Sequence, residues 1–141
     1  MELCVATDLS PSSRAAVDLV LSWAQKLGAS VRLLHVVHDP VLAPALSNDV
    51  PSDVARADEA LRAIAARAPC PCKVDVRTAE DVAGEVVTAS KRCAYLFVGS
   101  QGKSAFERLR LGSIATAVLR KSHVPVVCIP HPKKGAGGAS S

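Results

Sequence analysis

Aromatic residues are scarce in this chain: one Trp, one Tyr and two Phe make up 3% of its 141 residues. A core with so few rings has to be built from Val, Leu, Ile and Ala. Proteins that bind single-stranded nucleic acid usually stack the bases on aromatic side chains. The scarcity therefore argues against that class of protein, and we expect no nucleic-acid partner.

Long apolar runs are also missing. No stretch approaches the roughly 20 apolar residues that a membrane-spanning helix needs, and the first residues, Met1-Glu2, lead directly into a short apolar segment. A signal peptide would open on a basic region instead. We expect no membrane association and a cytoplasmic location.

The five cysteines form no recognisable framework. Cys70-Pro71-Cys72 lacks the Cys-x-x-Cys spacing, and no Cys and His set completes a zinc quartet. Cys4 and Cys128 lie inside apolar runs, where a thiol acts as a small hydrophobic group. With Cys93 the cysteines number five, and an odd number without a disulfide framework favours a reducing compartment. We expect no metal site, and no Ser-His-Asp or Cys-His set predicts a catalytic residue.

Size and charge indicate one globular domain. The chain is 49% hydrophobic with a net charge of +4, and its length matches a typical domain of about 100–150 residues. The mild basic excess favours anionic partners but is too sparse for a DNA-binding surface. We expect a domain over residues 1–131, followed by a flexible Gly- and Ser-rich tail over residues 132–141.

Apolar segments alternate with segments of helical spacing along the chain. The expected strands are 3–6, 31–37, 73–77, 95–98 and 124–129, and the expected helices are 11–27, 52–68, 82–93 and 114–121. Residues 38–51 contain three prolines and are expected to form a loop. This alternation predicts an α/β fold with a five-stranded parallel doubly wound sheet and four helices. In the expected strand order, 3-2-1-4-5, the ends of strands 1, 2 and 4 lie together.

A glycine motif follows the fourth expected strand. Two residues separate Gly99 from Gly102, and nine residues, Lys103 among them, separate Gly102 from Gly112-Ser113. Glycine lets the backbone approach a phosphate closely, and a helix N-terminus favours an anion. Two glycines alone are explained equally well by a turn, but the full spacing before a helix favours a phosphate site.

Two better-known phosphate motifs do not fit. Gly102-Lys103-Ser104 looks like the end of a P-loop, but Phe97 occupies the position of the required first glycine. The dinucleotide signature should follow the first strand, where Thr7-Asp8-Leu9-Ser10 stands instead.

These motifs together resemble those of a universal stress protein domain over about residues 2–130. The family's first strand ends in an Asp, as at Asp8, and its second strand resembles residues 33–37. Its nucleotide-binding branch carries Gly-x2-Gly-x9-Gly-Ser/Thr, with the spacing found here. Its closing Ser-x-x-Pro-Val matches residues 122–126. The resemblance implies an adenine nucleotide alpha-hydrolase-like fold.

The resemblance also implies an ATP-type site. Asp8 and Val36 would lie at the adenine and ribose, Val98, Gly99 and Gly102 at the ribose and phosphates, and Gly112, Ser113 and Ile114 at the phosphates. The full expected set is completed by Ala6, Thr7, Gln101, Lys103 and Ala115. Gln101 stands where relatives often carry His or Arg. The expected ligand is ATP with Mg or Mn, with AMP and cyclic AMP as alternatives.

The expected function is that of a nucleotide-dependent switch or partner-binding module in stress response, with an unknown protein partner. Hydrolysis should be slow at most, since Asp8 has no neighbouring carboxylate cluster in the motifs. The alternatives are a nucleotide-free dimeric stress protein and an ATP-using transferase on the same fold. Asp8 also fits a helix-cap role, and His35 fits a packed residue better than a catalyst. The apolar last strand, Val124–Ile129, indicates a homodimer paired through that strand.

Overall fold

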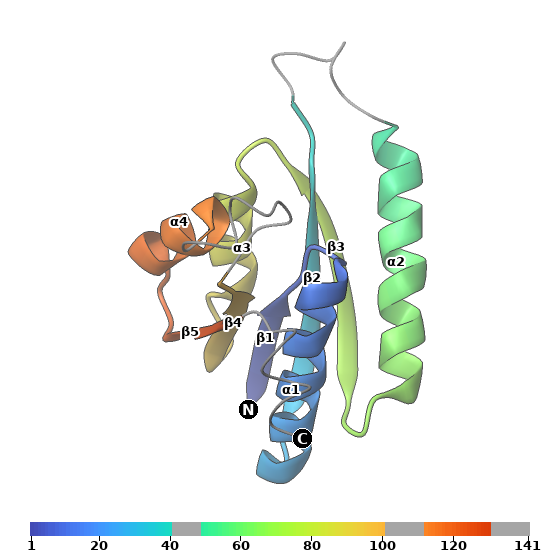
Figure 1. The fold of residues 1–141 in the computed structure, drawn as a ribbon, viewed down its shortest axis with the longest axis vertical. Helices are drawn as coiled ribbons and strands as arrows, with labels where there is room; N and C mark the ends of the chain where they lie inside the picture. Colours follow the sequence, from blue (N-terminus) through green and yellow to red (C-terminus); the bar gives the residue numbers. More distant parts are fainter. Residues whose placement is uncertain (41–48, 101–111, 131–141) are drawn as a thin grey trace, which may run out of the picture.

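The computed structural model describes residues 1–40, 49–100 and 112–130. It contains one parallel sheet of five strands in the order β3-β2-β1-β4-β5, with the helices as crossovers between strands (Figure 1). The expected fold class, strand order and number of helices are confirmed. The elements are β1 (Glu2–Ala6), α1 (Pro11–Leu27), β2 (Ser30–His38), α2 (Val50–Arg67), β3 (Cys72–Ala79), α3 (Val82–Ser90), β4 (Tyr95–Gly99), α4 (Ser113–Lys121) and β5 (Val126–Ile129).

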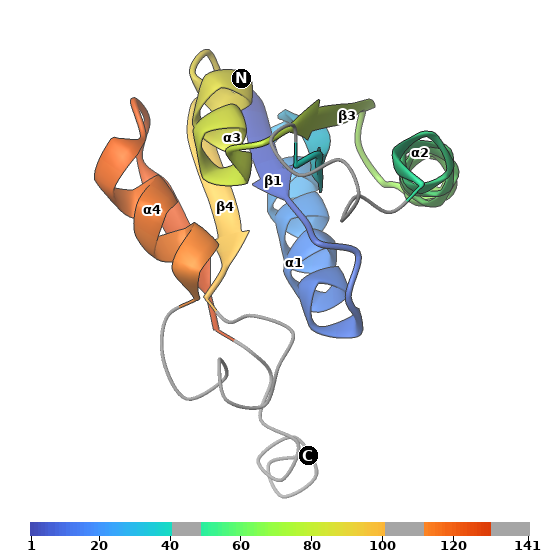
Figure 2. The same ribbon diagram turned by 90° about the horizontal axis from the view of Figure 1, so that it is seen from above.

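The sheet separates two apolar clusters. Helices α1 and α2 cover one face and α3 and α4 cover the other (Figure 2). Alternate residues of β1 point to opposite faces, so Leu3 and Val5 join the first cluster while Cys4 joins the second. Because the core fills both faces, the polar ends of the strands are the place where a ligand can reach the sheet.

The ends of α1 follow from local sequence. The Ser10 side chain accepts a hydrogen bond from the Ser13 amide, and Pro11 occupies the first turn. Gly28 ends the helix with φ of 66°, a left-handed conformation that glycine adopts without a steric penalty. Helix α1 therefore begins and ends where the sequence predicts.

Helix α2 begins earlier than predicted. The prolines of residues 38–51 indicate a loop, but Val50 and Pro51 belong to the helix, and the Asp49 side chain accepts a hydrogen bond from the Ser52 amide. Proline is tolerated in the first turn because that turn needs no amide donor. Residues 41–48 of the expected loop lie outside the described residues.

Strand β5 is shorter than predicted. It begins at Val126, because Pro125 has no amide donor and the Ser122 hydroxyl instead binds the backbone of Val124. The Pro125 carbonyl still accepts a hydrogen bond from the Leu96 amide. The expected tail, 132–141, lies outside the described residues. In the described ranges, no helix has the length and apolar character needed to cross a membrane.

Candidate functional site

A cavity of about 320 Å³ lies at the carboxyl ends of β1, β2 and β4. Strand β1 is central, so its last residue, Ala6, pairs with both Leu34 of β2 and Val98 of β4. The first turns of α3 and α4 close the cavity from the side. The lining residues are Ala6, Thr7, Asp8, Ser13, Leu34, His35, Val36, Val82, Val86, Val98, Gly99, Gly112, Ser113, Ile114 and Ala115.

The turn between β1 and α1 is fixed by a chain of hydroxyl hydrogen bonds. The Thr7 hydroxyl oxygen accepts from the Leu9 amide at 3.0 Å, and the Ser13 hydroxyl donates to the Ser10 carbonyl at 3.0 Å. Thr7 Oγ1 and Ser13 Oγ are 2.7 Å apart. Because the Ser13 proton is already donated, Thr7 is the donor in this pair.

This turn presents Asp8 to the cavity. Leu9 has φ of 64°, an unfavourable value for a residue with a side chain, and the surrounding hydrogen bonds maintain it. Asp8 Oδ1 accepts a hydrogen bond from the Ser10 amide at 2.9 Å. Asp8 therefore has the structural role that the sequence left open, and it also lines the cavity.

His35 is fixed against the same turn. Its Nδ1 atom lies 2.7 Å from the Thr7 carbonyl oxygen. A carbonyl can only accept, so Nδ1 carries the proton, and in the neutral ring the lone pair is on Nε2. The sequence favours a packed or strand-end histidine over a catalyst; the ring is half-buried and also lines the cavity.

The N-terminus of α4 faces the cavity, and among the described residues no side chain caps it. Ser10, Asp49 and Asp81 cap the helices α1, α2 and α3, whereas Gly112 supplies no capping group to α4. The amides of a first helical turn have no partner within their helix. This end of α4 therefore offers amide donors and the positive end of the helix dipole to an anion.

The structure brings most of the predicted site residues together. Those that line the cavity are Ala6, Thr7, Asp8, Val36, Val98, Gly99, Gly112, Ser113, Ile114 and Ala115. Gln101, Gly102 and Lys103 lie outside the described residues.

Five lining residues were not predicted: Ser13, Leu34, His35, Val82 and Val86. Val82 and Val86 are four residues apart on α3, and this spacing indicates an apolar helix face without saying what the face contacts. Ser13 follows the cap of α1 by three residues, which gives a signal for a helix start only.

The described part of the cavity has an apolar wall and a polar end. Val36, Val82, Val86 and Val98 form the wall, and the α4 N-terminus forms the polar end together with the β1–α1 turn. Such a site suits a ligand with a flat apolar part and an anionic part. Among the described residues, no group of three or more His, Cys, Asp or Glu side chains could hold a metal ion.

Comparisons with known proteins concern the family and the fold of the chain. The sequence profile described as "Universal stress protein family" matches residues 1–130. The chain is 32% identical to Universal stress protein MJ0531 of Methanocaldococcus jannaschii over 142 aligned residues, which cover 94% of this chain and 84% of the relative. The fold is similar to that of the universal stress protein UspA from Lactobacillus plantarum, with a TM-score of 0.77, 22% identity and coverage of 92% and 97% of the two chains.

Two further solved structures of similar fold contain adenine nucleotides. One is a universal stress protein in complex with cAMP, with a TM-score of 0.66, 24% identity and coverage of 92% of this chain and 96% of that chain. The other is the universal stress protein from Archaeoglobus fulgidus in complex with dAMP, with a TM-score of 0.60, 18% identity and coverage of 92% and 97%.

Proposed function

The chain belongs to the universal stress protein family, and on that premise we propose that it binds an adenine nucleotide, ATP in the first place, in the cavity at the carboxyl ends of β1, β2 and β4. Binding would make it a nucleotide-dependent switch or partner-binding module in stress response. The cAMP and dAMP complexes of relatives support the ligand class. We place this activity in the cytoplasm, in keeping with the reduced cysteines that the sequence favours.

The observation that carries the proposal is the N-terminus of α4 at the cavity, which no side chain of the described ranges caps. A phosphate there would accept hydrogen bonds from the first-turn amides of Ser113, Ile114 and Ala115, and the Ser113 hydroxyl could add another donor. Gly112 is buried and has no side chain that could cap this end of the helix.

The apolar wall suits the adenine ring. Val36 and Val98 come from two strands, and Val82 and Val86 approach from α3. Burying a flat ring among these side chains stabilises the complex through the apolar area removed from water. Asp8, beside this wall, offers a carboxylate to ribose hydroxyls.

Turnover of the nucleotide would be slow. Asp8 is the one carboxylate among the described lining residues, and it also accepts a hydrogen bond from the Ser10 amide. Phosphoryl transfer depends on several positioned groups and on metal ions that neutralise the phosphates. ATP would bring Mg or Mn with it, held mainly by its own phosphates.

The nucleotide itself can be tested first. The protein is purified without added nucleotide, denatured, and the supernatant analysed for adenine nucleotides; thermal shifts are then recorded with ATP, AMP and cyclic AMP, with and without Mg or Mn. We expect released nucleotide or a rise in the melting temperature with at least one ligand. If no nucleotide is released and no ligand raises the melting temperature, the nucleotide-free stress protein becomes the better description. Rapid ATP consumption would favour the transferase.

A substitution tests the phosphate end of the cavity. Gly112→Val adds bulk at a buried lining position, and the backbone there, with φ of −64° and ψ of 157°, is accessible to any residue. We expect nucleotide binding to weaken by at least about a hundredfold, because the phosphate loses its close approach to the backbone.

The matched control is Ala117→Val, which introduces the same side chain into α4 at a position outside the cavity lining. Isothermal titration measures the affinities, and circular dichroism checks the fold of both variants. Equal affinity in Gly112→Val and the wild type would remove the α4 N-terminus from the site.

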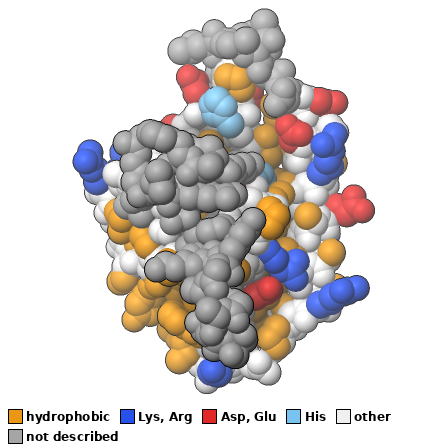
Figure 3. All heavy atoms as spheres, viewed as in Figure 1, with side chains coloured by type: hydrophobic (Ala, Val, Ile, Leu, Met, Phe, Trp, Pro, Cys, Tyr) orange, Lys and Arg blue, Asp and Glu red, His pale blue; other side chains and the backbone are white. Residues whose placement is uncertain are grey.

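The two edges of the sheet support a homodimer through β5. On β3 the edge carries Lys73, Asp75 and Arg77, and charged side chains discourage strand pairing. On β5 all four residues, Val126–Ile129, are apolar. Figure 3 shows hydrophobic side chains gathered over the part of the molecule where β4 and β5 lie. We propose that a second copy pairs along β5.

A further inference from the structure

His35 holds the point at which β1 leaves the sheet. Strand β1 pairs with β2 as far as Ala6 and Leu34, and the Thr7 amide still donates to the Leu34 carbonyl at 2.9 Å. The next bond comes from a side chain, because His35 Nδ1 lies 2.7 Å from the Thr7 carbonyl oxygen and donates to it. Both backbone groups of Thr7 are therefore bonded to two consecutive residues of β2.

The ring of His35 lies on the α1 side of the sheet. Its neighbours Leu34 and Val36 belong to the apolar cluster under α3 and α4, whereas Leu33 belongs to the cluster under α1 and α2. Because side chains alternate along a strand, His35 shares the side of Leu33. It therefore borders the cavity on the other side of the sheet from the apolar wall, next to the β1–α1 turn.

The turn that follows Thr7 contains a strained residue and is held by two bonds of its own. Leu9 has φ of 64°, and its amide donates to Thr7 Oγ1 at 3.0 Å. The Ser10 amide donates to Asp8 Oδ1 at 2.9 Å. Each of these bonds joins residues two positions apart, so they fix the shape of the turn. His35 adds a bond from a segment 28 residues away, which fixes the turn against the sheet.

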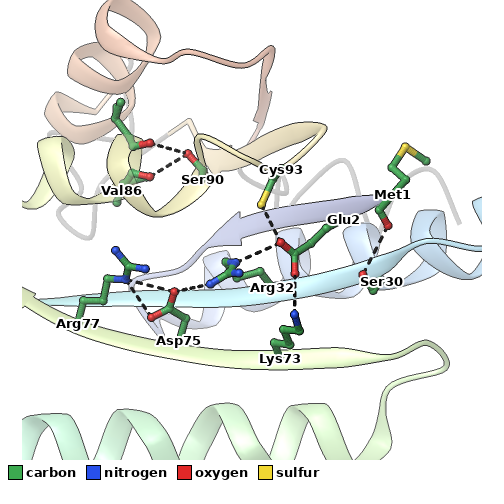
Figure 4. A network of polar contacts seen from close by, with 11 residues as sticks. Met1, Glu2, Ser30, Arg32, Lys73, Asp75, Arg77, Val86, Ser90 and Cys93 are labelled. Carbon is green, nitrogen blue, oxygen red and sulfur yellow. Dashed lines mark hydrogen bonds and ion pairs between the residues drawn. The ribbon is translucent and has the colours of Figure 1, made fainter.

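The other end of β1 is fixed by charges. Glu2 is paired with Arg32 of β2 and with Lys73 of β3, as Figure 4 shows. The Ala94 amide also donates to the Glu2 carbonyl at 2.8 Å. Strand β1 is therefore held in register from its amino end, and the motion left for the histidine to limit is local to the turn.

The Thr7 carbonyl also determines the direction of Asp8. The peptide group is planar, so the oxygen of Thr7, the amide nitrogen of Asp8 and the Asp8 Cα atom lie in one plane. A hydrogen bond to that oxygen limits the rotation of the plane about the bonds on either side of it. The bond from His35 therefore limits the directions that the Asp8 carboxylate can take at the cavity.

We propose that His35 is a positioning residue of the nucleotide site, a role that rests on the proposed function. Its Nδ1–H bond keeps the Thr7–Asp8 peptide in the orientation that directs the Asp8 carboxylate to the ribose hydroxyls. Without the bond the peptide group rotates more freely, and part of the binding free energy is used to order it. The role requires no contact between His35 and the nucleotide.

Two substitutions of the same shape separate the hydrogen bond from the volume of the ring. Asn and Leu have the same branching, but only Asn can donate to the Thr7 carbonyl. We expect His35→Leu to weaken nucleotide binding about tenfold, in keeping with one lost hydrogen bond, and His35→Asn to stay within about twofold of the wild type. Isothermal titration with ATP, AMP and cyclic AMP measures the affinities, and circular dichroism checks the fold.

The control is His38→Leu, which changes an exposed histidine at the end of β2 that lies outside the cavity lining. We expect it to leave the affinity unchanged. Equal losses for His35→Asn and His35→Leu would show that the donated hydrogen bond is not what matters, and would overturn the proposal.

A double-mutant cycle tests whether the effect passes through Asp8. If His35 acts by directing the Asp8 carboxylate, removing that carboxylate should cancel the effect. We therefore expect His35→Leu to change the affinity by less than about twofold when Asp8→Ala is already present. A loss as large as in the wild-type background would show that His35 acts on the nucleotide directly or on the fold as a whole, which contradicts a positioning role.

Two measurements need no nucleotide. In the free wild-type protein, the nitrogen NMR shifts of the His35 ring should show the proton on Nδ1 in alkaline buffer; a proton on Nε2 would overturn the proposal without any substitution. Amide hydrogen exchange at Leu9 and Ser10 should be about tenfold faster in His35→Leu than in the wild type and unchanged in His35→Asn, because these bonded amides report the opening of the turn.

These measurements separate the role of His35 from the function on which it rests. A wild type that binds none of ATP, AMP and cyclic AMP would overturn the proposed function, and with it the nucleotide role of His35. If a nucleotide binds and His35→Leu leaves the exchange of Leu9 and Ser10 unchanged, the proposed function stands and the positioning role fails.

Discussion

Asp75 is held between two arginines on the surface side of the sheet. Its carboxylate accepts from Arg32 at 2.8 Å and from Arg77 at 3.0 Å, and its side chain is only 16% exposed. Burial raises the pKa of Asp75, but the hydrogen bonds from Arg77 and Arg32 together lower it by more than burial raises it. The pKa of Asp75 therefore lies below the usual value. The charged form is therefore bound more tightly in the native state than in the unfolded chain.

Asp75→Asn should destabilise the protein at neutral pH by about 1 to 2 kcal/mol, because both guanidinium groups lose a charged acceptor. A native pKa below the unfolded one gives stability that is present above the ordinary aspartate pKa of about 4 and is lost as the pH falls below it. The difference between variant and wild type should therefore shrink on acidification. Urea unfolding at several pH values measures it.

The control for this residue is Asp58→Asn, which breaks an exposed pair with Arg62 on α2. Water screens that pair, so we expect a loss of about 0.5 kcal/mol or less. Equal losses in the two variants would show that Asp75 acts as an ordinary surface charge.

At the scale of elements, helix α3 carries two adjacent valines with different surroundings. Val86 lines the cavity and Val87 does not, although both are buried. We expect Val86→Ala to weaken nucleotide binding by about fivefold, equal to about 1 kcal/mol of lost apolar contact, and Val87→Ala to leave it unchanged. Isothermal titration measures both affinities.

Both substitutions remove the same atoms from the core, so each should lower the free energy of unfolding by a similar amount, about 2 kcal/mol. Stability thus serves as the common reference for the pair. If Val86→Ala and Val87→Ala lost the same affinity as well as the same stability, the result would speak against a contact between α3 and the nucleotide.

The elements also show what the sequence could and could not predict. The strand order was predictable because apolar strands and helical segments alternate along the chain. The place of Gly99 and Gly112 at the cavity was predictable because the motif has a fixed spacing. The start of α2 was not, because Pro51 reads equally as a loop or as a first turn. The position of His35 depends on the parallel pairing of β1 with β2, which brings Thr7 from a distant segment. Such a contact leaves no local pattern in the sequence.

At the scale of the whole molecule, the sheet has one charged edge and one apolar edge. We expect Val127→Glu on β5 to convert the dimer to a monomer, since the charge would be buried between two copies of the strand. Size-exclusion chromatography with light scattering measures the mass, and circular dichroism checks the fold.

Thr78→Glu on β3 is the matched control, because it places the same charge on the opposite edge of the sheet. We expect it to remain dimeric. A Val127→Glu protein that is folded and still dimeric would show that the interface does not run through β5.

The direction of β1 has a practical consequence for these measurements. The chain enters the sheet at Glu2, at the amino end of its central strand, and Met1 is 62% exposed. The five residues of β1 span about 17 Å at 3.3 Å per residue before the cavity is reached. A sensor surface or fluorophore attached at the amino terminus would therefore leave the cavity open to solution, so this is the end at which to tether the protein for affinity measurements.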